Sequence, residues 1–459
     1  MNIKGSIARV FSANLLTMVS GILIGFIVPA VLSLDSYAYV KTYMLYVGYI
    51  GFLHFGFIDG MYIKYGGKSI DEIDKSVLKA EHNIFIIMQT IMTLIIVTIA
   101  IITKDFILIL FGISILPINT GSFHKLFYQS TGQFKSFAKT SYIYSIIYLT
   151  INMIGAYVLK SDNYIFYCLA SLIGHIVVFS ILEIKICKEF RGIKATYTKD
   201  LKNNIKVGAV ILIANLGVMI FSAADLWFVK IGLSKESFAY YSFAISMLNI
   251  INVMIMSVSI TFYNFLAKEE NEELVLKLKN YFILFGGLCS FAYFGFAMIV
   301  NIFIKKYTPA LEIIAISFAG FPYIIVIKGL LVNLYNARKD EKKYLKVMLS
   351  MVAISIVYNL IAIIIFKTME SIAMATLLSF ITWYIYSSYD LGYTKVRKKE
   401  ILYLAIVLVA FLITTNTMHW IVGAVMYLII YTLVSFCMYN KEINEAIGFI
   451  SSKLKAIRV

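Results

Sequence analysis

The chain has 459 residues, of which 61% are apolar and 14% are charged, and its formal net charge is +16. Soluble domains are about 45–50% apolar and about 25% charged, so this composition excludes a water-soluble globular protein. The whole chain holds only four prolines, which leaves its apolar runs uninterrupted. Runs of about 20 apolar residues are long enough to cross a bilayer as α-helices. The sequence therefore predicts an all-α polytopic membrane protein.

Fourteen apolar runs predict about fourteen transmembrane helices. In chain order they cover residues 11–32, 37–63, 83–103, 105–128, 140–159, 163–185, 206–231, 237–264, 281–304, 308–334, 345–366, 370–391, 401–415 and 418–439. The thirteenth run is short and is the weakest of the set. An even number of spans places both ends of the chain on the same side of the membrane.

Lysine and arginine counts predict which side that is. With the N-terminus in the cytoplasm, 31 of the 41 basic residues fall on the cytoplasmic side, seven fall outside and three lie within spans. Cytoplasmic loops of membrane proteins carry an excess of Lys and Arg, and anionic headgroups attract such residues. We therefore predict cytoplasmic N- and C-termini, and a net charge that needs no nucleic acid partner to explain it.

Two similarities within the chain predict an internal repeat. Residues 32–40 (LSLDSYAYV) and 233–241 (LSKESFAYY) are identical at five of nine positions, with an offset of 201. A second similarity has an offset of 207 and matches Tyr128, Lys135, Lys139, Asn152 and Lys160 with Tyr335, Lys342, Lys346, Asn359 and Lys367. Both offsets correspond to six predicted spans, and an even number keeps the orientation, so the repeat is parallel.

The repeat defines a domain plan of two six-helix lobes. We predict an N-terminal lobe over 1–185, a basic cytoplasmic linker over 186–205 and a C-terminal lobe over 206–392. Two extra transmembrane helices and a cytoplasmic tail occupy 393–459. Transporters built from such repeats hold their substrate between the lobes, near the midplane of the membrane.

Two ionisable residues deep in predicted spans are the sharpest site candidates, because a charge within the bilayer is costly and is a functional hypothesis by default. Lys328, in GFPYIIVIKGLLVNLYNAR, precedes Arg338 by ten residues, which is about 15 Å along a helix. It either lines a cavity or pairs with a carboxylate. Asp225, in FSAADLWFVK, could pair with a lysine across the lobes, bind a coupling cation or solubilise a helix end.

Four further residues are weaker candidates for a role in transport, because a purely structural role would also explain each of them. Lys41 lies about 9 Å from the outer end of its span and Lys125 about 12 Å from the inner end, so both could snorkel to the membrane surface. Asp59 is near the inner end of its span, where a hydrogen bond to the next loop is the alternative to a transport role. Asn215 could line the cavity or bond a neighbouring helix.

Three lysines within spans, against few carboxylates, favour an anionic ligand. A lysine binds phosphate as a point charge, and a partly dry cavity strengthens the attraction, so a lipid-linked diphosphate would suit. The sequence contains no nucleophile–base pair, no Cys/His cluster with metal-ligand spacing and no P-loop. We therefore predict a transporter rather than an enzyme, with no metal and no cofactor.

Three segments resemble the Wzx-type polysaccharide (O-antigen oligosaccharide) flippases of bacteria. They are GYIGFLHFGFIDGMYIKYGGK (48–68), YQSTGQFKSFAK (128–139) and VGAVILIANLGVMIFSAADLWFV (207–229). The resemblance extends over residues 5–440 and rests on pattern more than on a rigid signature. An Asp-Arg pair is common in the family's seventh span, whereas Leu226 follows Asp225 here.

The resemblance implies a fold of the MOP superfamily, which also contains the lipid II flippases and the MATE multidrug exporters. It implies that the chain flips undecaprenyl-diphosphate-linked oligosaccharide, a repeat unit of O-antigen, capsule or exopolysaccharide, from the inner to the outer leaflet of the bacterial cytoplasmic membrane by alternating access. By this analogy Lys41, Asp225 and Lys328 lie on spans 2, 7 and 10. Membrane lipids, a coupling ion (Na⁺ or H⁺) and a polysaccharide polymerase are the further partners expected.

Two alternatives remain open at this point. A cation-coupled multidrug exporter would share the fold, but its cationic substrates would favour buried carboxylates over lysines. A glycan polymerase or ligase would need residues outside the membrane to hold its substrate, and the short outer connections supply no such domain.

Overall fold

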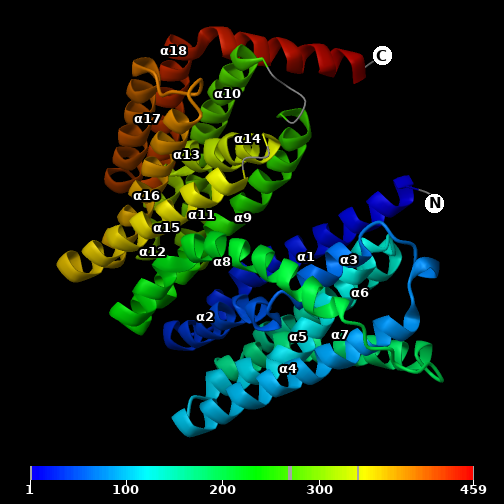
Figure 1. Cartoon of the computed structure of the whole chain (residues 1–459). Helices are drawn as coiled ribbons and strands as arrows, with labels where there is room; N and C mark the ends of the chain where they lie inside the picture. Colours follow the sequence, from blue (N-terminus) through cyan, green and yellow to red (C-terminus); the bar gives the residue numbers. More distant parts are fainter. Residues whose placement is uncertain (1–2, 267–270, 339–340, 458–459) are drawn as a thin grey trace. The chain divides into compact units, whose positions relative to one another are not determined.

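The computed structural model describes residues 3–266, 271–338 and 341–457, and within these ranges every regular element is a helix. The chain divides into two compact units, Met1–Leu216 and Gly217–Val459. The boundary falls inside helix α8, Asp200–Gly232, which Figure 1 labels together with the other long helices.

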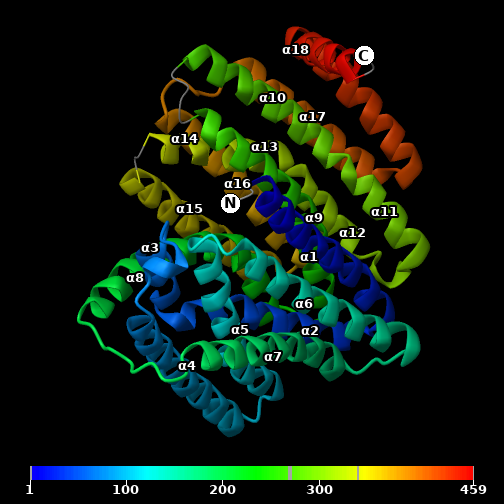
Figure 2. The ribbon, with the colours of Figure 1, turned by 90° about the vertical axis from the view of Figure 1, so that its right-hand side faces the viewer.

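The first unit is an all-helical bundle that ends partway along α8. Its other elements are α1 (Ile3–Val31), α2 (Leu34–Gly48), η1 (Ile50–His54), α3 (Phe57–Tyr65), η2 (Ile70–Glu72), α4 (Lys75–Thr103), α5 (Phe106–Ser130), α6 (Phe134–Met153), the π-helical η3 (Ile154–Val158) and α7 (Tyr164–Glu189). Helix α1 packs against α6, α4 against α5, and both α5 and α6 against α7, as Figure 2 shows for α5, α6 and α7. Phe57, Phe85, Phe123 and Phe127 belong to the core of this bundle.

The second unit begins within α8 and is also helical throughout its described residues. It contains α9 (Lys235–Leu266), α10 (Glu272–Ser290), α11 (Ala292–Phe303), η4 (Lys305–Tyr307), α12 (Ala310–Ala319), α13 (Phe321–Val326), the π-helical η5 (Ile327–Leu331), α14 (Val332–Ala337), α15 (Glu341–Ile361), the π-helical η6 (Ala362–Phe366), α16 (Met369–Asp390), α17 (Lys398–Thr417) and α18 (Trp420–Ile457). Helix α9 packs against α12, α10 against α13, α15 against α16 and α17 against α18.

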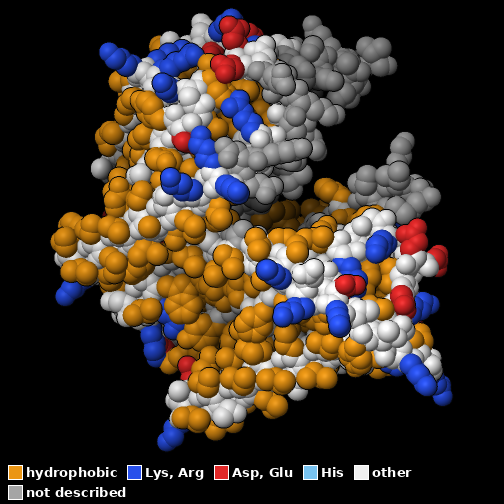
Figure 3. All heavy atoms as spheres, viewed as in Figure 1, with side chains coloured by type: hydrophobic (Ala, Val, Ile, Leu, Met, Phe, Trp, Pro, Cys, Tyr) orange, Lys and Arg blue, Asp and Glu red, His pale blue; other side chains and the backbone are white. Residues whose placement is uncertain are grey.

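Hydropathy and exposure identify a multi-pass membrane protein. Among the described residues, ten helices are long and apolar enough to cross a membrane, and up to twelve if two bent helix pairs each count as one span. Predicted span 401–415 is among the ten, as part of Lys398–Thr417. On α4, the side chains of Ile87, Leu94 and Ile102 are 60%, 61% and 74% exposed. Figure 3 shows apolar side chains over much of the face that it draws, as expected of a surface that contacts lipid.

Two predicted spans, 37–63 and 308–334, are broken rather than continuous helices. The first bends by 59° between His54 and Phe57, and the second by 44° at Gly320. In the first, Phe55 and Gly56 have φ values of +50° and +81°, which an α-helix cannot accommodate. An apolar run shows that a segment can cross lipid, but it does not show where the backbone turns.

The segments related by offset 201 begin their helices in the same way. Ser33 precedes α2, and its Oγ accepts a hydrogen bond from the Ser36 N–H at 3.3 Å. Ser234 precedes α9, and its Oγ accepts from the Ser237 N–H at 3.1 Å. A serine cap that satisfies an otherwise unpaired helix N–H therefore stands at corresponding positions in both segments.

The segments related by offset 207 end their helices in the same way. Helices α6 and α15 each finish in a π-helical turn, η3 and η6. Lys160 and Lys367 follow with φ values of +46° and +54°, an unusual conformation for a residue other than glycine. Asn152 and Asn359 each donate a side-chain hydrogen bond to the carbonyl four residues earlier, at 2.7 and 2.8 Å. Both pairs of segments therefore share local structure at their helix ends, and the repeat itself stays a prediction.

The two C-terminal helices are fastened to α10 by buried polar contacts. The Lys279 ammonium lies 2.7 Å from a carboxylate oxygen of Glu400 and donates to the Thr394 carbonyl at 2.8 Å. Lys279 and Glu400 are 1% and 4% exposed. The Tyr427 hydroxyl of α18 donates to the Gly287 carbonyl at 2.7 Å.

Three glycines let the break before α3 lie directly against the first half of α8, all within the first unit. A Cβ added to Gly208 would lie 1.9 Å from the Gly56 carbonyl oxygen and 2.4 Å from the Gly60 amide nitrogen. A Cβ on Gly60 would lie 2.2 Å from the Asn204 carbonyl oxygen. The obstacles are backbone atoms, so no side-chain rotation could relieve the overlap.

Gly208→Ala is therefore expected to destabilise the protein by about 1–3 kcal/mol, the usual cost of overpacking. Thermal unfolding of the purified protein in detergent should show a lower midpoint. Gly25→Ala in α1 is the matched control, since a Cβ there meets no atom within 4 Å and alanine favours a helix interior by about 0.5–1 kcal/mol over glycine. Equal midpoints for the two variants would contradict the close contact.

Candidate functional site

Lys328 lies in the π-helical turn η5, in the second half of the broken span 308–334. Its side chain is half-buried, and its ammonium donates to the Asn252 side-chain oxygen on α9 at 3.3 Å. Among the described residues, no carboxylate forms an ion pair with Lys328. Its partner is a neutral amide, so its positive charge is hydrogen-bonded without being neutralised. A π turn within a helix is frequently found at functional sites.

A polar seam between α9 and the η5–α14 segment surrounds the backbone of Lys328. The Ser259 hydroxyl donates to the Lys328 carbonyl at 2.7 Å. The buried Asn333 amide donates to the Ser259 carbonyl and to the Gly329 carbonyl, both at 3.0 Å. Lys328 and Gly329 belong to the η5 turn and Ser259 belongs to α9, so these hydrogen bonds join the turn that carries Lys328 to the neighbouring helix.

Asp225 is buried near the end of α8, where it is 5% exposed. One carboxylate oxygen accepts from the Tyr241 hydroxyl of α9 at 2.8 Å, and the other accepts from the Leu226 N–H at 2.8 Å. A lysine partner was one of the predicted possibilities, but in the described residues a tyrosine of the same unit occupies that place. Asn252 and Tyr241 both belong to α9, so one helix positions both polar candidates of the second unit.

Lys41 and Lys125, in the first unit, each lie over an aromatic ring. The Lys41 ammonium is 5.2 Å from the centre of the Tyr37 ring on its own helix α2. The Lys125 ammonium of α5 is 4.9 Å from the centre of the Phe137 ring of α6. Both lysines are half-buried. A cation over a ring face is attracted to its π electrons, so each ring stabilises the ammonium above it.

Asp59 lies in the first turn of α3, directly after the break in its span. One of its oxygens is 3.9 Å from Nε2 of His54, and Nδ1 of His54 accepts from the Gly56 N–H at 3.2 Å. Because Nδ1 is the acceptor, the neutral imidazole carries its proton on Nε2, the nitrogen nearer Asp59. This arrangement places Asp59 at the bend of the chain.

Asn215, the sixth predicted residue, is exposed on α8. The six candidates are therefore divided between the units, with Lys328 and Asp225 in the second and the other four in the first. The roles assigned to them from the sequence remain predictions.

A polar cluster within the first unit has no signal in the sequence. Nε2 of His82 and Nε2 of His124 lie 3.0 and 3.2 Å from the same oxygen of Glu183. The three residues come from α4, α5 and α7 and lie near one end of each helix. Their spacing in the chain resembles no motif, so only the packing of three helices brings them together.

Two imidazoles and a carboxylate could also hold a metal ion, since zinc accepts this ligand set. The three ligand atoms lie within 4.8 Å of one another. However, Nδ1 of His124 is buried and has no hydrogen-bond partner among the described residues, whereas a metal-bound histidine almost always donates its other N–H to an acceptor. The geometry therefore favours a hydrogen-bonded cluster that joins three helices.

Glu183→Ala is expected to destabilise the protein, because it removes the acceptor of two buried imidazole N–H groups, at about 1–3 kcal/mol for each unsatisfied donor. Glu183→Gln keeps an acceptor oxygen and should lose less. Glu189→Ala on the same helix is the control, because Glu189 is 53% exposed and pairs with Lys185 at 3.7 Å, a contact worth about 0–1 kcal/mol. Unfolding midpoints in detergent would rank the three variants, and equal losses for Glu183→Ala and Glu189→Ala would contradict the cluster.

Comparisons with known proteins identify a fold. No family model and no curated protein matches the chain. Among solved structures, the lipid II flippase MurJ in its inward closed conformation matches with a TM-score of 0.67 and 14% identity, covering 95% of this chain and 99% of that one. The chain therefore has the fold of this membrane transporter.

Two MATE structures match more distantly. A MATE mutant matches with a TM-score of 0.46 and 12% identity, covering 85% of this chain and 96% of that one. An outward-facing multidrug resistance MATE family transporter of the MOP superfamily has a TM-score of 0.42 and 11% identity, with the same coverage of 85% and 96%.

Proposed function

We propose that this chain is a flippase for undecaprenyl-diphosphate-linked oligosaccharide in the bacterial inner membrane. It would move the sugar–diphosphate head from the inner to the outer leaflet by alternating access while the prenyl tail stays in lipid. The oligosaccharide is a repeat unit of O-antigen, capsule or exopolysaccharide. A polysaccharide polymerase at the outer face would then consume the product.

The proposal rests on the surroundings of the Lys328 ammonium. Its ammonium is half-buried within a membrane span and is held by the Asn252 amide rather than by a carboxylate. Away from bulk water the field of such a charge is weakly screened, and the phosphate oxygens of a diphosphate supply the opposite charge. Lys41 and Lys125, each over an aromatic ring, add two further partly buried cations.

The fold supports the same proposal. The similar flippase acts on lipid II, and a protein of this fold that carries positive charges within its spans is suited to an anionic lipid-linked head. A cation-coupled drug exporter is the second candidate, and Asp225 is the observation in its favour. A buried carboxylate that keeps one tyrosine donor is suited to bind a coupling ion, Na⁺ or H⁺.

Deletion of the gene tests the proposal directly. We expect the lipid-linked oligosaccharide to accumulate on the cytoplasmic leaflet, where an added membrane-impermeant enzyme reaches it only after the cells are opened. Surface glycan should fall in parallel, and a plasmid copy should restore it. Unchanged surface glycan together with increased sensitivity to cationic drugs would instead identify the multidrug exporter.

A further inference from the structure

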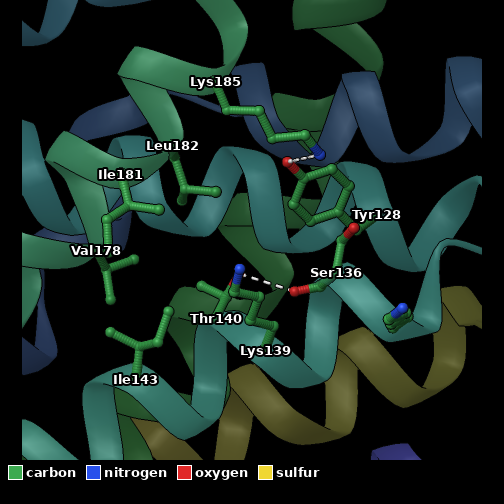
Figure 4. Close-up of a pocket in the computed structure, with 10 residues that line it drawn as sticks. Tyr128, Ser136, Lys139, Thr140, Ile143, Val178, Ile181, Leu182 and Lys185 are labelled. Atoms are coloured by element: carbon green, nitrogen blue, oxygen red, sulfur yellow. Dashed lines mark hydrogen bonds between the residues drawn. The ribbon is translucent and has the colours of Figure 1, made fainter.

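A pocket between α5, α6 and α7 is lined by none of the residues used above for transport. Its cavity is about 190 Å³, a volume equal to about six water molecules of the liquid. Three lysines, three hydroxyl-bearing residues and four aliphatic residues line it, namely Lys135, Lys139, Lys185, Tyr128, Ser136, Thr140, Ile143, Val178, Ile181 and Leu182. Figure 4 shows side chains of α6 and α7 pointing toward one another across it.

The lining changes from charged to apolar along the helices. Lys135 and Lys139 lie in the first two turns of α6, and Lys185 lies in the last turns of α7. Ile143 and Val178 lie about 13 and 16 Å from those same helix ends, at 1.5 Å per residue. One end of the pocket is therefore cationic and the other is aliphatic, which is the order in which a phospholipid carries its headgroup and its acyl chains.

The lysines are available to an anion. Lys135 and Lys139 are exposed, and among the described residues neither forms an ion pair with a carboxylate. Lys185 donates to the Tyr128 hydroxyl at 3.3 Å and is 3.7 Å from Glu189. The Tyr128 oxygen accepts from Lys185, which leaves its own proton for an acceptor such as a phosphate oxygen.

We propose that this pocket binds the phosphate of an anionic phospholipid, with the start of an acyl chain against Val178, Ile181 and Leu182. Basic pockets between transmembrane helices are suited to anionic headgroups, and the predicted orientation places this one in the inner leaflet. None of the lining residues belongs to the set used above for transport. The site is therefore distinct from the proposed substrate path, and its occupancy does not depend on the proposed function.

The test measures lipid binding to the purified, delipidated full chain by native mass spectrometry. The probes are phosphatidylglycerol and, with the same acyl chains, phosphatidylcholine. We expect the double variant Lys135→Gln with Lys139→Gln to weaken phosphatidylglycerol binding by on the order of tenfold, because each basic residue near a membrane surface contributes severalfold. Phosphatidylcholine binding should be weak and unchanged.

The repeat supplies the matched control. Lys342→Gln with Lys346→Gln removes two exposed lysines at the corresponding positions of the second unit and should change the affinity less than twofold. Equal losses in the two double variants, or equal binding of the two lipids by the unmodified chain, would overturn the proposal. Displacement of phosphatidylglycerol by an equal concentration of inorganic phosphate, or a larger loss for undecaprenyl diphosphate than for phosphatidylglycerol, would overturn it as well.

A second variant tests the apolar half with every lysine in place. Ile181 is 41% exposed, so Ile181→Trp can fill the pocket without disturbing the core. We expect it to reduce phosphatidylglycerol binding severalfold at an unchanged unfolding midpoint. Full binding by this variant would exclude acyl-chain contact, even if the double lysine variant failed to fold.

Discussion

Lys328→Ala should reduce export of the lipid-linked oligosaccharide by about 10- to 100-fold, while the amount of protein in the membrane stays the same. A hydrogen bond to a charged group contributes about 1.5–3 kcal/mol, and this range corresponds to the stated loss. The protein itself should tolerate the change, because Lys328 has no carboxylate partner among the described residues that would be left buried and unpaired.

Surface glycan, normalised to protein level, measures the effect. Lys328→Arg keeps the charge and should retain most of the export, although a guanidinium differs in shape from an ammonium. Asn252→Ala removes the hydrogen-bond acceptor but keeps the charge, and should have a smaller effect than Lys328→Ala. If Lys328→Ala exports normally, the cation is not part of the transport path.

Lys279→Ala should destabilise the second unit by about 3–5 kcal/mol, because breaking a buried ion pair leaves the remaining charge uncompensated. The charge left behind is Glu400, which accepts from the Tyr384 hydroxyl as well as from Lys279. The pair joins α10 to α17, so we expect the two C-terminal helices to separate from the unit at a lower temperature than in the unmodified protein.

Two further variants test whether burial of the Lys279–Glu400 pair causes the expected loss of stability. Lys279→Met combined with Glu400→Gln removes both charges and keeps an acceptor for Tyr384, so it should recover most of the lost stability. Lys277→Ala breaks a contact from the same helix to Glu445 in which both side chains are more than a third exposed, and should cost about 0–1 kcal/mol. A Lys279→Ala midpoint equal to that of Lys277→Ala would contradict the prediction.

The positions of the helices could be predicted from the sequence because lipid imposes a simple rule. Every backbone group must be paired within the span, so apolar length alone indicated each helix. The bend before α3 could not be predicted, because Phe55 is not a residue that usually adopts a positive φ. The bend at Gly320 does have a signal in the sequence, because Pro322 follows it at the start of α13 and proline breaks a helix. The hydrogen-bonded cluster of His82, His124 and Glu183 was missed for a different reason, since it depends on how three separate helices rotate against one another.

For the candidate site residues too, some properties could be predicted from the sequence and others could not. Burial of Asp225 and of Lys328 followed from their depth within apolar runs. Their partners, Tyr241 and Asn252, could not be inferred because hydropathy does not specify which face of α9 meets which neighbour.

The paired serine caps and π turns lie at the ends of helices, where they set how a helix begins and finishes and leave its middle unconstrained. The position 207 residues before Lys328 is Gly121. On the predicted repeat, a cation within a span of one half therefore needs no counterpart in the other half.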